Sequence, residues 1–370
     1  ATFRHDDYRL YVGCYPNDPE TIAAVREVRD RRIRLVVGPT DGQTTKADCL
    51  NQLWKALLAD EAADGRKAKA VILHDAEDVV HEAELRIFDR LIERFDLVQL
   101  PVLPLIDRNS RWVAGHYIDE FAESHGKELV VREALGAGLP SAGVGCAFSR
   151  DMLGAIAGAS TAGPFDAASL TEDYELGLRI RSAGGRAAFV RLPESGGRSV
   201  VVTREFFPGT MGAAIKQKAR WMTGIALSGW DRLGWSGGLA ERWMRLRDRQ
   251  SVLAAVFLFA AYVALMLWAL LGLRHVLLGI EPTPTPAFLA AMLSANAYLL
   301  AWRLAMRFGF VTRAYGWREG LRSIPRVVVG NVIAMLAARK AVFHYLGARK
   351  SGVQPRWDKT AHAFPALPAE

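Results

Sequence analysis

Residues 70–78 read AVILHDAED, an apolar run that ends in three carboxylates, and this stretch decides the fold. Such a short, uninterrupted apolar run is typical of a strand that is buried on both faces of a sheet. Similar runs occur at 9–15, 33–39 and 97–103. Amphipathic stretches that separate the runs are predicted to be helices, at Thr21–Arg31, Cys49–Asp60 and Glu82–Phe95. This alternation predicts an α/β domain with a mainly parallel sheet.

Asp75, Glu77 and Asp78 follow the strand at 70–73, at the edge where parallel sheets bind their ligands. Three carboxylates there concentrate negative charge, which is costly unless a cation neutralises it. Carboxylate oxygens are ligands for Mg²⁺ or Mn²⁺, and such a metal bridges a diphosphate and stabilises it as a leaving group. The alternative is a solvated acidic turn, because acidic turns after strands are common.

A second acidic pair, Glu172 and Asp173, follows Thr171 at the start of a predicted amphipathic helix. A carboxylate in this place is a candidate general base that deprotonates an acceptor hydroxyl. Threonine followed by acidic residues is also what a helix N-terminus prefers, so the alternative is a cap alone. The two interpretations are compatible if Thr171 caps the helix and Asp173 acts as the base.

Two further segments carry candidate binding residues. Asp41 and Lys46 lie in a predicted strand-to-helix turn, where backbone N–H groups favour phosphate; the alternative is a capped helix and no more. Gln217, Arg220 and Trp221 are spaced i, i+3 and i+4, so they share one helix face. An amide, a guanidinium and an indole are suited to an acceptor sugar and a pyrophosphate. The alternative is a basic amphipathic helix that leads toward a membrane.

The chain changes character after about residue 240. The uncharged run at 252–273 is long enough to span a bilayer, and 286–302 is a second candidate span. The run at 327–337 is too short to span alone, so we expect an interfacial helix, with a third span as the alternative. Arginines flank the outer ends of this hairpin and are sparse at its tip, which places both ends and the large domain in the cytoplasm. A buried core helix is the alternative for 252–273.

Composition narrows the class further. The net charge of the 370 residues is +8, and the excess basic residues cluster beside apolar segments, which indicates a membrane surface. No aromatic–basic pattern typical of RNA binding occurs, so we expect no nucleic-acid partner. The three cysteines, Cys14, Cys49 and Cys146, are widely spaced and predict neither a disulfide framework nor a zinc site. A reducing compartment fits best.

In their order and spacing these motifs resemble the membrane-bound family 2 glycosyltransferases, such as cellulose synthase and hyaluronan synthase. The resemblance covers nearly the whole chain and rests on KADCLN at 46–51, the D-x-D-like strand end, the T/E-D pair and Q-x-x-R-W before the apolar helices. It implies a GT-A fold and an inverting transfer from a nucleotide-sugar, expected to be a UDP-sugar, with Mg²⁺ or Mn²⁺ as cofactor. The acceptor is a glycan or a lipid-linked molecule at the bacterial inner membrane, with an outer-membrane export partner also expected.

The resemblance also assigns roles residue by residue. Asp75 and Glu77 occupy the two D-x-D positions and Asp78 extends them as the metal site, although a glutamate in the second position leaves open which carboxylate holds the metal. The remaining roles are donor contacts by Asp18, Asp41, Lys46 and Asp75, catalysis by Asp173 with Glu172 beside it, and acceptor or pyrophosphate contacts by Gln217, Arg220 and Trp221.

The expected organisation is a GT-A domain at 1–240, a membrane region at 241–350 with two spans and an interfacial helix, and a cytoplasmic tail at 351–370. Family members have a strand before the one that begins this chain, so we expect an open sheet edge and an incomplete nucleotide pocket. The alternative function is a catalytically inactive scaffold that binds nucleotide-sugar, such as a phage receptor or a secretion-complex component. A transporter is disfavoured, because two or three spans without an ionisable residue in the first lack a translocation path.

Overall fold

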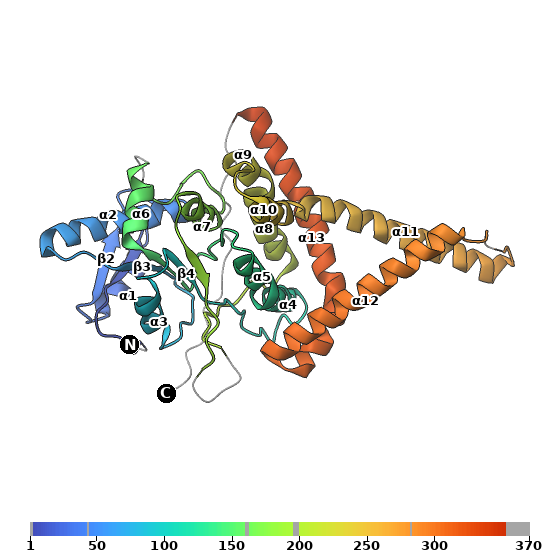
Figure 1. Ribbon diagram of the computed structural model, residues 1–370, viewed down its shortest axis with the longest axis horizontal. Coiled ribbons are helices and arrows are strands. Elements are labelled where there is room, and N and C mark those ends of the chain that lie inside the picture. Colours follow the sequence, from blue (N-terminus) through green and yellow to red (C-terminus); the bar gives the residue numbers. More distant parts are fainter. Residues whose placement is uncertain (1–2, 43, 160–162, 195–199, 282, 353–370) are drawn as a thin grey trace.

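The computed structural model describes residues 3–42, 44–159, 163–194, 200–281 and 283–352. The strands and the first three helices lie at one end of the molecule, and a long helical hairpin projects from the other (Figure 1). The six strands are β1 Leu10–Cys14, β2 Ile33–Val37, β3 Ala70–Leu73, β4 Leu97–Gln99, β5 Cys146–Ser149 and β6 Ala187–Phe189. Each of the four predicted strands is therefore present.

The strands form two sheets, and the larger one is mixed. β1 and β2 pair in parallel, with Leu10 opposite Ile33. The second sheet has the order β3-β5-β4-β6, in which β5 is antiparallel to both of its neighbours and β4 is parallel to β6. The α/β class is confirmed, whereas the sheet is mixed rather than mainly parallel. The physical reason is that the chain reverses through the 135–145 loop before the largely buried strand β5, a reversal that hydrophobic runs alone do not encode.

The helices of the globular part follow the predicted pattern with shifted ends. They are α1 Pro19–Glu27, α2 Lys46–Asp64, α3 Glu84–Leu91, α4 Val113–Glu123, α5 Leu129–Ala134, α6 Arg150–Gly158, α7 Glu172–Ser182, α8 Met211–Met222, α9 Gly229–Leu233 and α10 Leu239–Arg249. Two π-helical segments, η1 Ser124–Glu128 and η2 Thr223–Ser228, extend α4 and α8. The main core lies where β4 and β5 pack against α7, through residues such as Leu97, Phe148 and Leu176.

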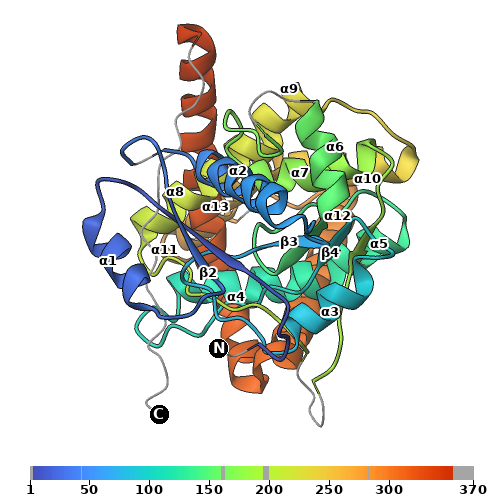
Figure 2. The same cartoon turned by 90° about the vertical axis from the view of Figure 1, so that its left-hand side faces the viewer.

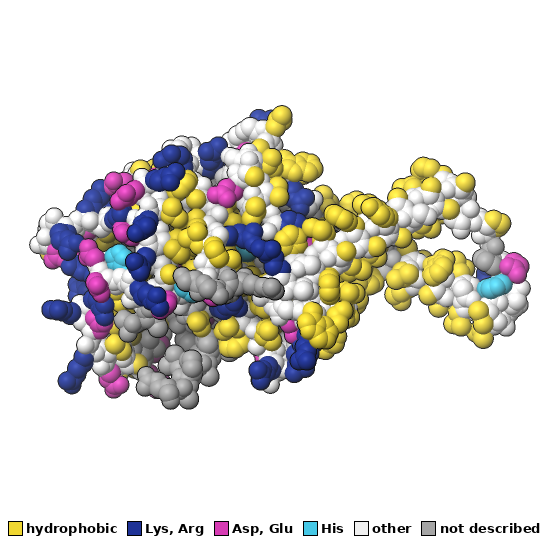
Figure 3. Space-filling view, turned by 60° about the horizontal axis from the view of Figure 1, so that its bottom comes forward, with side chains coloured by type: hydrophobic (Ala, Val, Ile, Leu, Met, Phe, Trp, Pro, Cys, Tyr) yellow, Lys and Arg dark blue, Asp and Glu magenta, His cyan; other side chains and the backbone are white. Residues whose placement is uncertain are grey.

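Three C-terminal helices are long and apolar enough, by length and composition, to cross a membrane: α11 Ser251–Leu278, α12 Ala287–Tyr315 and α13 Trp317–Ser351. α11 and α12 form the projecting hairpin, whose surface is almost wholly apolar along its length (Figure 3). Phe257 and Trp268 on α11 are more than 70% exposed, which excludes the alternative that 252–273 is a buried core helix. Both predicted spans are therefore exposed apolar helices, longer than the sequence runs that predicted them.

The run at 327–337 belongs to a single helix of 35 residues, so the expectation of a short helix underestimates its length. α13 crosses the base of the hairpin and packs against α4 and α8, and its C-terminal end extends beyond the rest of the molecule (Figure 2). Its N-terminal third is anchored by a buried arginine, Arg326, whose Nη2 lies 2.8 Å from Asp119 Oδ1 on α4. Beyond Gly352, the predicted tail lies outside the described residues.

Candidate functional site

Lys46, the first residue of α2, lies at the centre of the site. The hydroxyl of Thr45 caps α2 by accepting the N–H of Asp48 at 3.2 Å, which fixes where the helix begins. Lys46 Nζ lies 2.5 Å from Asp75 Oδ1 and donates to the carbonyl of Gly143 at 3.4 Å. Burial lowers the pKa of Lys46, but Asp75, Glu172 and Asp173 outweigh burial and raise it above its ordinary value. Carboxylates from two distant parts of the chain thus surround one ammonium group.

Glu172 and Asp173 lie in the first turn of α7. Burial raises the pKa of Glu172 to about 7, with a further contribution from the neighbouring Asp173. Burial also raises the pKa of Asp173, while Lys46 and Arg220 oppose this rise. One carboxylate oxygen of Asp173 accepts a hydrogen bond from the backbone N–H of Tyr174 at 2.7 Å. A carboxylate whose pKa is moved toward neutrality is suited to accept a proton.

The predicted cap by Thr171 is wrong. Thr171 precedes α7, but its hydroxyl makes no capping hydrogen bond. It is buried against η2, where a Cβ atom on Gly224 would lie 2.5 Å from its Oγ1. Among the described residues this oxygen has no hydrogen-bond partner. Close packing between α7 and η2 therefore takes precedence over capping.

The 141–145 loop, which packs directly against α7, was missed by sequence reasoning. Gln99, at the end of β4, is buried, and its amide N–H donates to the carbonyls of Val144 at 2.9 Å and Gly145 at 3.2 Å. Its Oε1 accepts the N–H of Ala142 at 2.9 Å. Gly143 has a φ of 77° and packs directly against Asp173. Two glycines in GVGC before a buried strand were the available signal.

The carboxylates after β3 do not form one ligand set. Asp78 turns inward: its side chain is 1% exposed, and its Oδ2 accepts the N–H of Asp75 at 2.9 Å and lies 3.2 Å from His74 Nδ1. Asp78 thus shapes the turn that carries Asp75 and the half-buried Glu77. Of these two carboxylates, Asp75 pairs with Lys46. Among the residues that the structure describes, no group of three or more His, Cys, Asp or Glu side chains is arranged to hold a metal ion.

A fourth carboxylate, Glu205, belongs to this acidic region and was not predicted. Glu205 is buried, and burial, followed by Asp78 and Asp75, raises its pKa to about 9. A buried oxygen of Asp78, Oδ1, lacks a hydrogen-bond partner among the described residues. Concentrated negative charge and the unpartnered oxygen of Asp78 are features that a divalent cation would neutralise.

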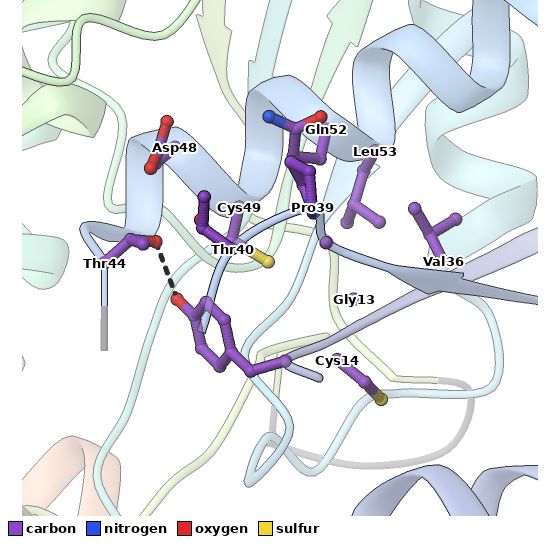
Figure 4. Close-up of a pocket in the computed structure, with 12 residues that line it drawn as sticks. Gly13, Cys14, Val36, Pro39, Thr40, Thr44, Asp48, Cys49, Gln52 and Leu53 are labelled. Atoms are coloured by element: carbon purple, nitrogen blue, oxygen red, sulfur yellow. Dashed lines mark hydrogen bonds between the residues drawn. The ribbon is translucent and has the colours of Figure 1, made fainter. Parts of the chain in front are cut away.

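The residues predicted to face the nucleotide lie at the carboxyl ends of β1 and β2. Asp18 caps α1, since its Oδ1 accepts the N–H of Thr21 at 3.1 Å, and Asp41 is exposed in the loop before α2. Asn17 and Gly42 join the two loops by reciprocal hydrogen bonds of 2.8 Å. A cavity of about 20 Å³ lies beside these loops, and its lining includes Tyr15 and Thr44, whose hydroxyls are 3.1 Å apart (Figure 4).

The three residues predicted to share a face of α8 have different surroundings. Arg220 is half-buried and lowers the pKa of both Glu172 and Asp173, so its charge reaches the site. Gln217 is buried, and among the described residues its Oε1 has no partner. Trp221 is half-buried in an aromatic cluster, with ring centroids 6.0 Å from Tyr117 and 6.4 Å from Phe207. The structure brings Arg220 to the acidic pair and packs Trp221 against α4.

An α/β domain that brings a lysine, an arginine and paired carboxylates together, followed by apolar helices, matches a known class of protein. The family model described as "Glycosyl transferase family group 2" matches residues 70–306, and the chain belongs to this family. The chain is 36% identical to bacteriophage adsorption protein B of Escherichia coli strain K12 over 395 aligned positions, which cover 99% of this chain and 52% of that protein. Bacteriophage N4 adsorption protein B of Escherichia coli O157:H7 matches to the same extent. The chain thus spans about half the length of these curated relatives.

Proposed function

We propose that this chain is the catalytic part of an inverting glycosyltransferase that moves a sugar from a nucleotide-sugar, specifically a UDP-sugar, to a hydroxyl of a glycan or lipid-linked acceptor. The observation that carries the proposal is the convergence of Lys46, Asp75 and Asp173 in one site. Lys46 and Asp75 are paired at 2.5 Å, and the charges of Lys46 and Asp75 both act on Asp173. Membership in the glycosyltransferase family supports the reaction class.

The residues divide the reaction between them. Asp173 accepts the proton of the acceptor hydroxyl, and the hydroxyl oxygen forms the new bond to the anomeric carbon. The bond from that carbon to the diphosphate breaks, and its electron pair leaves with the nucleoside diphosphate. Lys46 and Arg220 supply positive charge where negative charge develops on the leaving group. Asp18 and Asp41 contact the nucleotide, and Gln217 and Trp221 border the acceptor.

We also propose Mg²⁺ or Mn²⁺ as a cofactor held by Asp75 and Glu77. Mg²⁺ is usually bound through one or two carboxylates together with substrate phosphates, which suits a site without a complete cage of protein ligands. When bound, the ion stabilises the charge of the leaving diphosphate. Asp78 fixes the turn that presents the two carboxylates, and Glu205 adds negative charge beneath it.

Charge and packing support the membrane arrangement that we propose. We place the globular domain on the cytoplasmic side of a bacterial inner membrane, with α11 and α12 spanning it. α13 crosses the base of that hairpin and is held to α4 by the buried pair of Arg326 and Asp119, which favours a position at the membrane surface over a third span (Figure 1). An outer-membrane export partner would receive a polymeric product.

A donor screen tests the proposal. The full chain is purified in detergent and supplied with individual nucleotide-sugars, with and without Mn²⁺, and the released nucleoside diphosphate is measured. Asp173→Asn should lower the rate by about 10²–10⁴-fold, whereas Asp151→Asn, at an exposed carboxylate on α6, should leave it unchanged. Equal turnover by the Asp173→Asn variant and the unchanged chain would remove Asp173 as the base.

The names of the two relatives favour a second candidate, because both are called adsorption proteins. A catalytically inactive scaffold or phage receptor would bind a nucleotide-sugar without consuming it. The same screen, combined with a binding measurement, separates the two functions. Binding without release of nucleoside diphosphate, with or without Mn²⁺, identifies the scaffold.

A further inference from the structure

Helix α10 has a reversed pattern of burial. Its charged residues Glu241, Arg245 and Arg249 are buried, whereas Leu239 is 87% exposed and Trp243 is 54% exposed. A helix on the surface of a globular domain ordinarily buries its apolar side and exposes its polar side. Because most of the buried side of α10 is charged, hydrogen bonds and ion pairs, which are directional, set the position of this helix more than apolar packing does.

One of these contacts links α10 to the residue that follows the proposed base. The hydroxyl of Tyr174 donates a hydrogen bond of 2.6 Å to Asp248 Oδ2 on α10. Burial, followed by the charge of Asp248, raises the pKa of Tyr174 well above its ordinary value, so the hydroxyl keeps its proton and remains the donor. The backbone N–H of Tyr174 donates to a carboxylate oxygen of Asp173 at 2.7 Å. Tyr174 therefore contacts the proposed base through its main chain and α10 through its side chain.

A second contact links α10 to the loop before β5, which also packs against Asp173. In this loop the backbone N–H of Gly138 donates to Glu241 Oε2 on α10 at 2.7 Å. Arg132 joins the two contacts, since its Nε donates to the carbonyl of Gly138 at 2.6 Å and its Nη1 lies 2.9 Å from each carboxylate oxygen of Asp248. Both segments that contact Asp173, α7 and this loop, are thus bonded to α10.

The same helix continues into the first apolar helix of the projecting hairpin, at the base of that hairpin (Figure 1). Gln250 ends α10 and precedes α11, and its φ of −70° and ψ of −9° lie in the right-handed helical region. Its N–H donates to the carbonyl of Leu246 at 3.0 Å, and its carbonyl accepts the N–H of Ala254 at 2.8 Å, so helical hydrogen bonds run through the junction. Asp248 is three residues from Ser251, the first residue of α11, which is about 4.5 Å along a helix. A displacement of the start of α11 therefore moves Asp248.

We infer that α10 positions the proposed base from the membrane helix α11, with Tyr174 and Asp248 as the positioning residues. The inference rests on the proposed function and concerns where the base is held. Asp173 takes the proton of the acceptor hydroxyl only when its carboxylate lies within hydrogen-bond reach of that hydroxyl. A misplacement of about 1 Å lowers a rate by about 10²-fold. Because α7 is bonded to α10 and α10 continues into α11, the orientation of the membrane hairpin controls the position of the base.

Hydrogen exchange and steady-state kinetics of the full chain in nanodiscs test the two positioning residues. Tyr174→Phe removes the hydroxyl bond to Asp248 and keeps the ring, so amide exchange in a peptide that covers 171–176 should become about tenfold faster. The kcat should fall by about tenfold or more while the KM for the donor stays unchanged, because the base moves and the donor contacts do not. Tyr11→Phe is the matched control, since its hydroxyl also donates to a carboxylate, that of Asp60, at 3.1 Å. This control should change neither quantity.

An insertion of two glycines between Gln250 and Ser251 tests the link to the membrane. It interrupts the helical junction and leaves the residues that bond to Tyr174 and Gly138 unchanged. Exchange at 171–176 should rise and kcat should fall, as in Tyr174→Phe. The same insertion after Gly279, at the far end of α11, should have neither effect.

Three results would overturn the inference: unchanged exchange at 171–176 in Tyr174→Phe, equal changes there in Tyr174→Phe and Tyr11→Phe, or equal effects of the two insertions. Exchange does not depend on turnover, so it reports separately from the proposed function. If the unchanged chain hydrolyses no donor while the expected exchange pattern is found, the proposed function alone is wrong. If donor is consumed and Tyr174→Phe has the kcat of the unchanged chain, the positioning role alone is wrong.

Discussion

Asp173 packs against the backbone of Gly143, so that a Cβ atom on Gly143 would lie 3.1 Å from the Cβ of Asp173 and still closer to its carboxylate. Gly143 also accepts a hydrogen bond from Lys46 through its carbonyl. A single glycine thus contacts the proposed base and the lysine that lowers the pKa of that base. The loop that carries this glycine is fixed by the buried amide of Gln99.

Gly143→Ala should therefore lower the transfer rate by about tenfold or more, because a displacement of the base of about 1 Å is costly to catalysis. The φ of 77° adds backbone strain, so a control must share that strain. Gly136 provides it, since its φ is 67° and nothing lies within 4 Å of its Cβ position. Measured rates and thermal midpoints of Gly136→Ala and Gly143→Ala should show similar loss of stability from strain and a large loss of rate only for Gly143→Ala. Similar rates in both variants would contradict the role of this contact.

Lys46→Gln should move the acid limb of the pH–rate profile to higher pH. Lys46 lowers the pKa values of Asp173 and Glu172, so its removal raises both. The base acts only when ionised, and a higher pKa means that ionisation requires a higher pH. The profile of kcat/KM is measured for the unchanged chain, for Lys46→Gln and for Lys55→Gln, at an exposed position of the same helix. If the acid limb of Lys46→Gln did not move, Lys46 would not control the pKa of the base.

Glu205→Gln should stabilise the chain at pH 8 and have little effect at pH 5. The pKa of Glu205 is raised from 4.5 to about 9, so the folded state holds a proton that the unfolded state releases between these values. The stability of the unchanged chain therefore falls as pH rises through this window, whereas a glutamine has no such dependence. For a chain of 370 residues, an increase in thermal midpoint of about 1–2 °C at pH 8 corresponds to about 1 kcal/mol. Adding Mn²⁺ should reduce the difference, because a cation favours the ionised glutamate; an equal difference at pH 5 and pH 8 would contradict the shift.

Candidate catalytic and binding residues could be identified from the sequence where they lie at the end of a predicted strand or the start of a predicted helix. Asp75 follows a buried apolar run, and Asp173 follows a threonine at a helix start, so both could be identified from local pattern. Their approach to Lys46 could not be derived from local pattern, because it depends on how the two sheets are placed relative to each other. Family resemblance supplied that relationship, and the structure shows it as the shared influence of these carboxylates on Lys46.

Other features depend on contacts that no local pattern carries. The sequence predicts Asp78 as a third metal ligand. In the structure its side chain accepts a hydrogen bond from the backbone of the same turn, at Asp75, and this contact depends on the conformation of the turn. Glu205 lies in a segment whose sequence predicts neither a strand nor a helix. It belongs to the acidic site only because the fold buries it beside Asp75 and Asp78. Likewise, the packing of α8 against α13 requires two helices that are far apart in sequence to meet through alanines.

The pair of Arg326 and Asp119 gives a test of how α13 is attached to the globular part. Both side chains are fully buried, Arg326 Nη1 also lies 2.9 Å from Glu319 Oε2, and burial raises the pKa of Asp119 to about 7 although Arg326 lowers it. Arg326→Met should destabilise the chain by about 3–5 kcal/mol, because it leaves the buried Asp119 without its paired cation, whereas Glu319 keeps its ion pair with Arg322. Without Arg326 the pKa of Asp119 rises further, so the folded state takes up a proton and the loss should be smaller at pH 5 than at pH 8.

The double variant Asp119→Leu/Arg326→Met distinguishes the ion pair from simple loss of packing. Replacing both partners of a buried ion pair by apolar side chains is often neutral or stabilising, so the double variant should recover much of the stability that Arg326→Met loses. Thermal unfolding of the purified chains in detergent, at pH 5 and pH 8, measures both effects. If the double variant were as unstable as Arg326→Met at both pH values, the methylene packing of Arg326, rather than its charge, would hold α13 against α4.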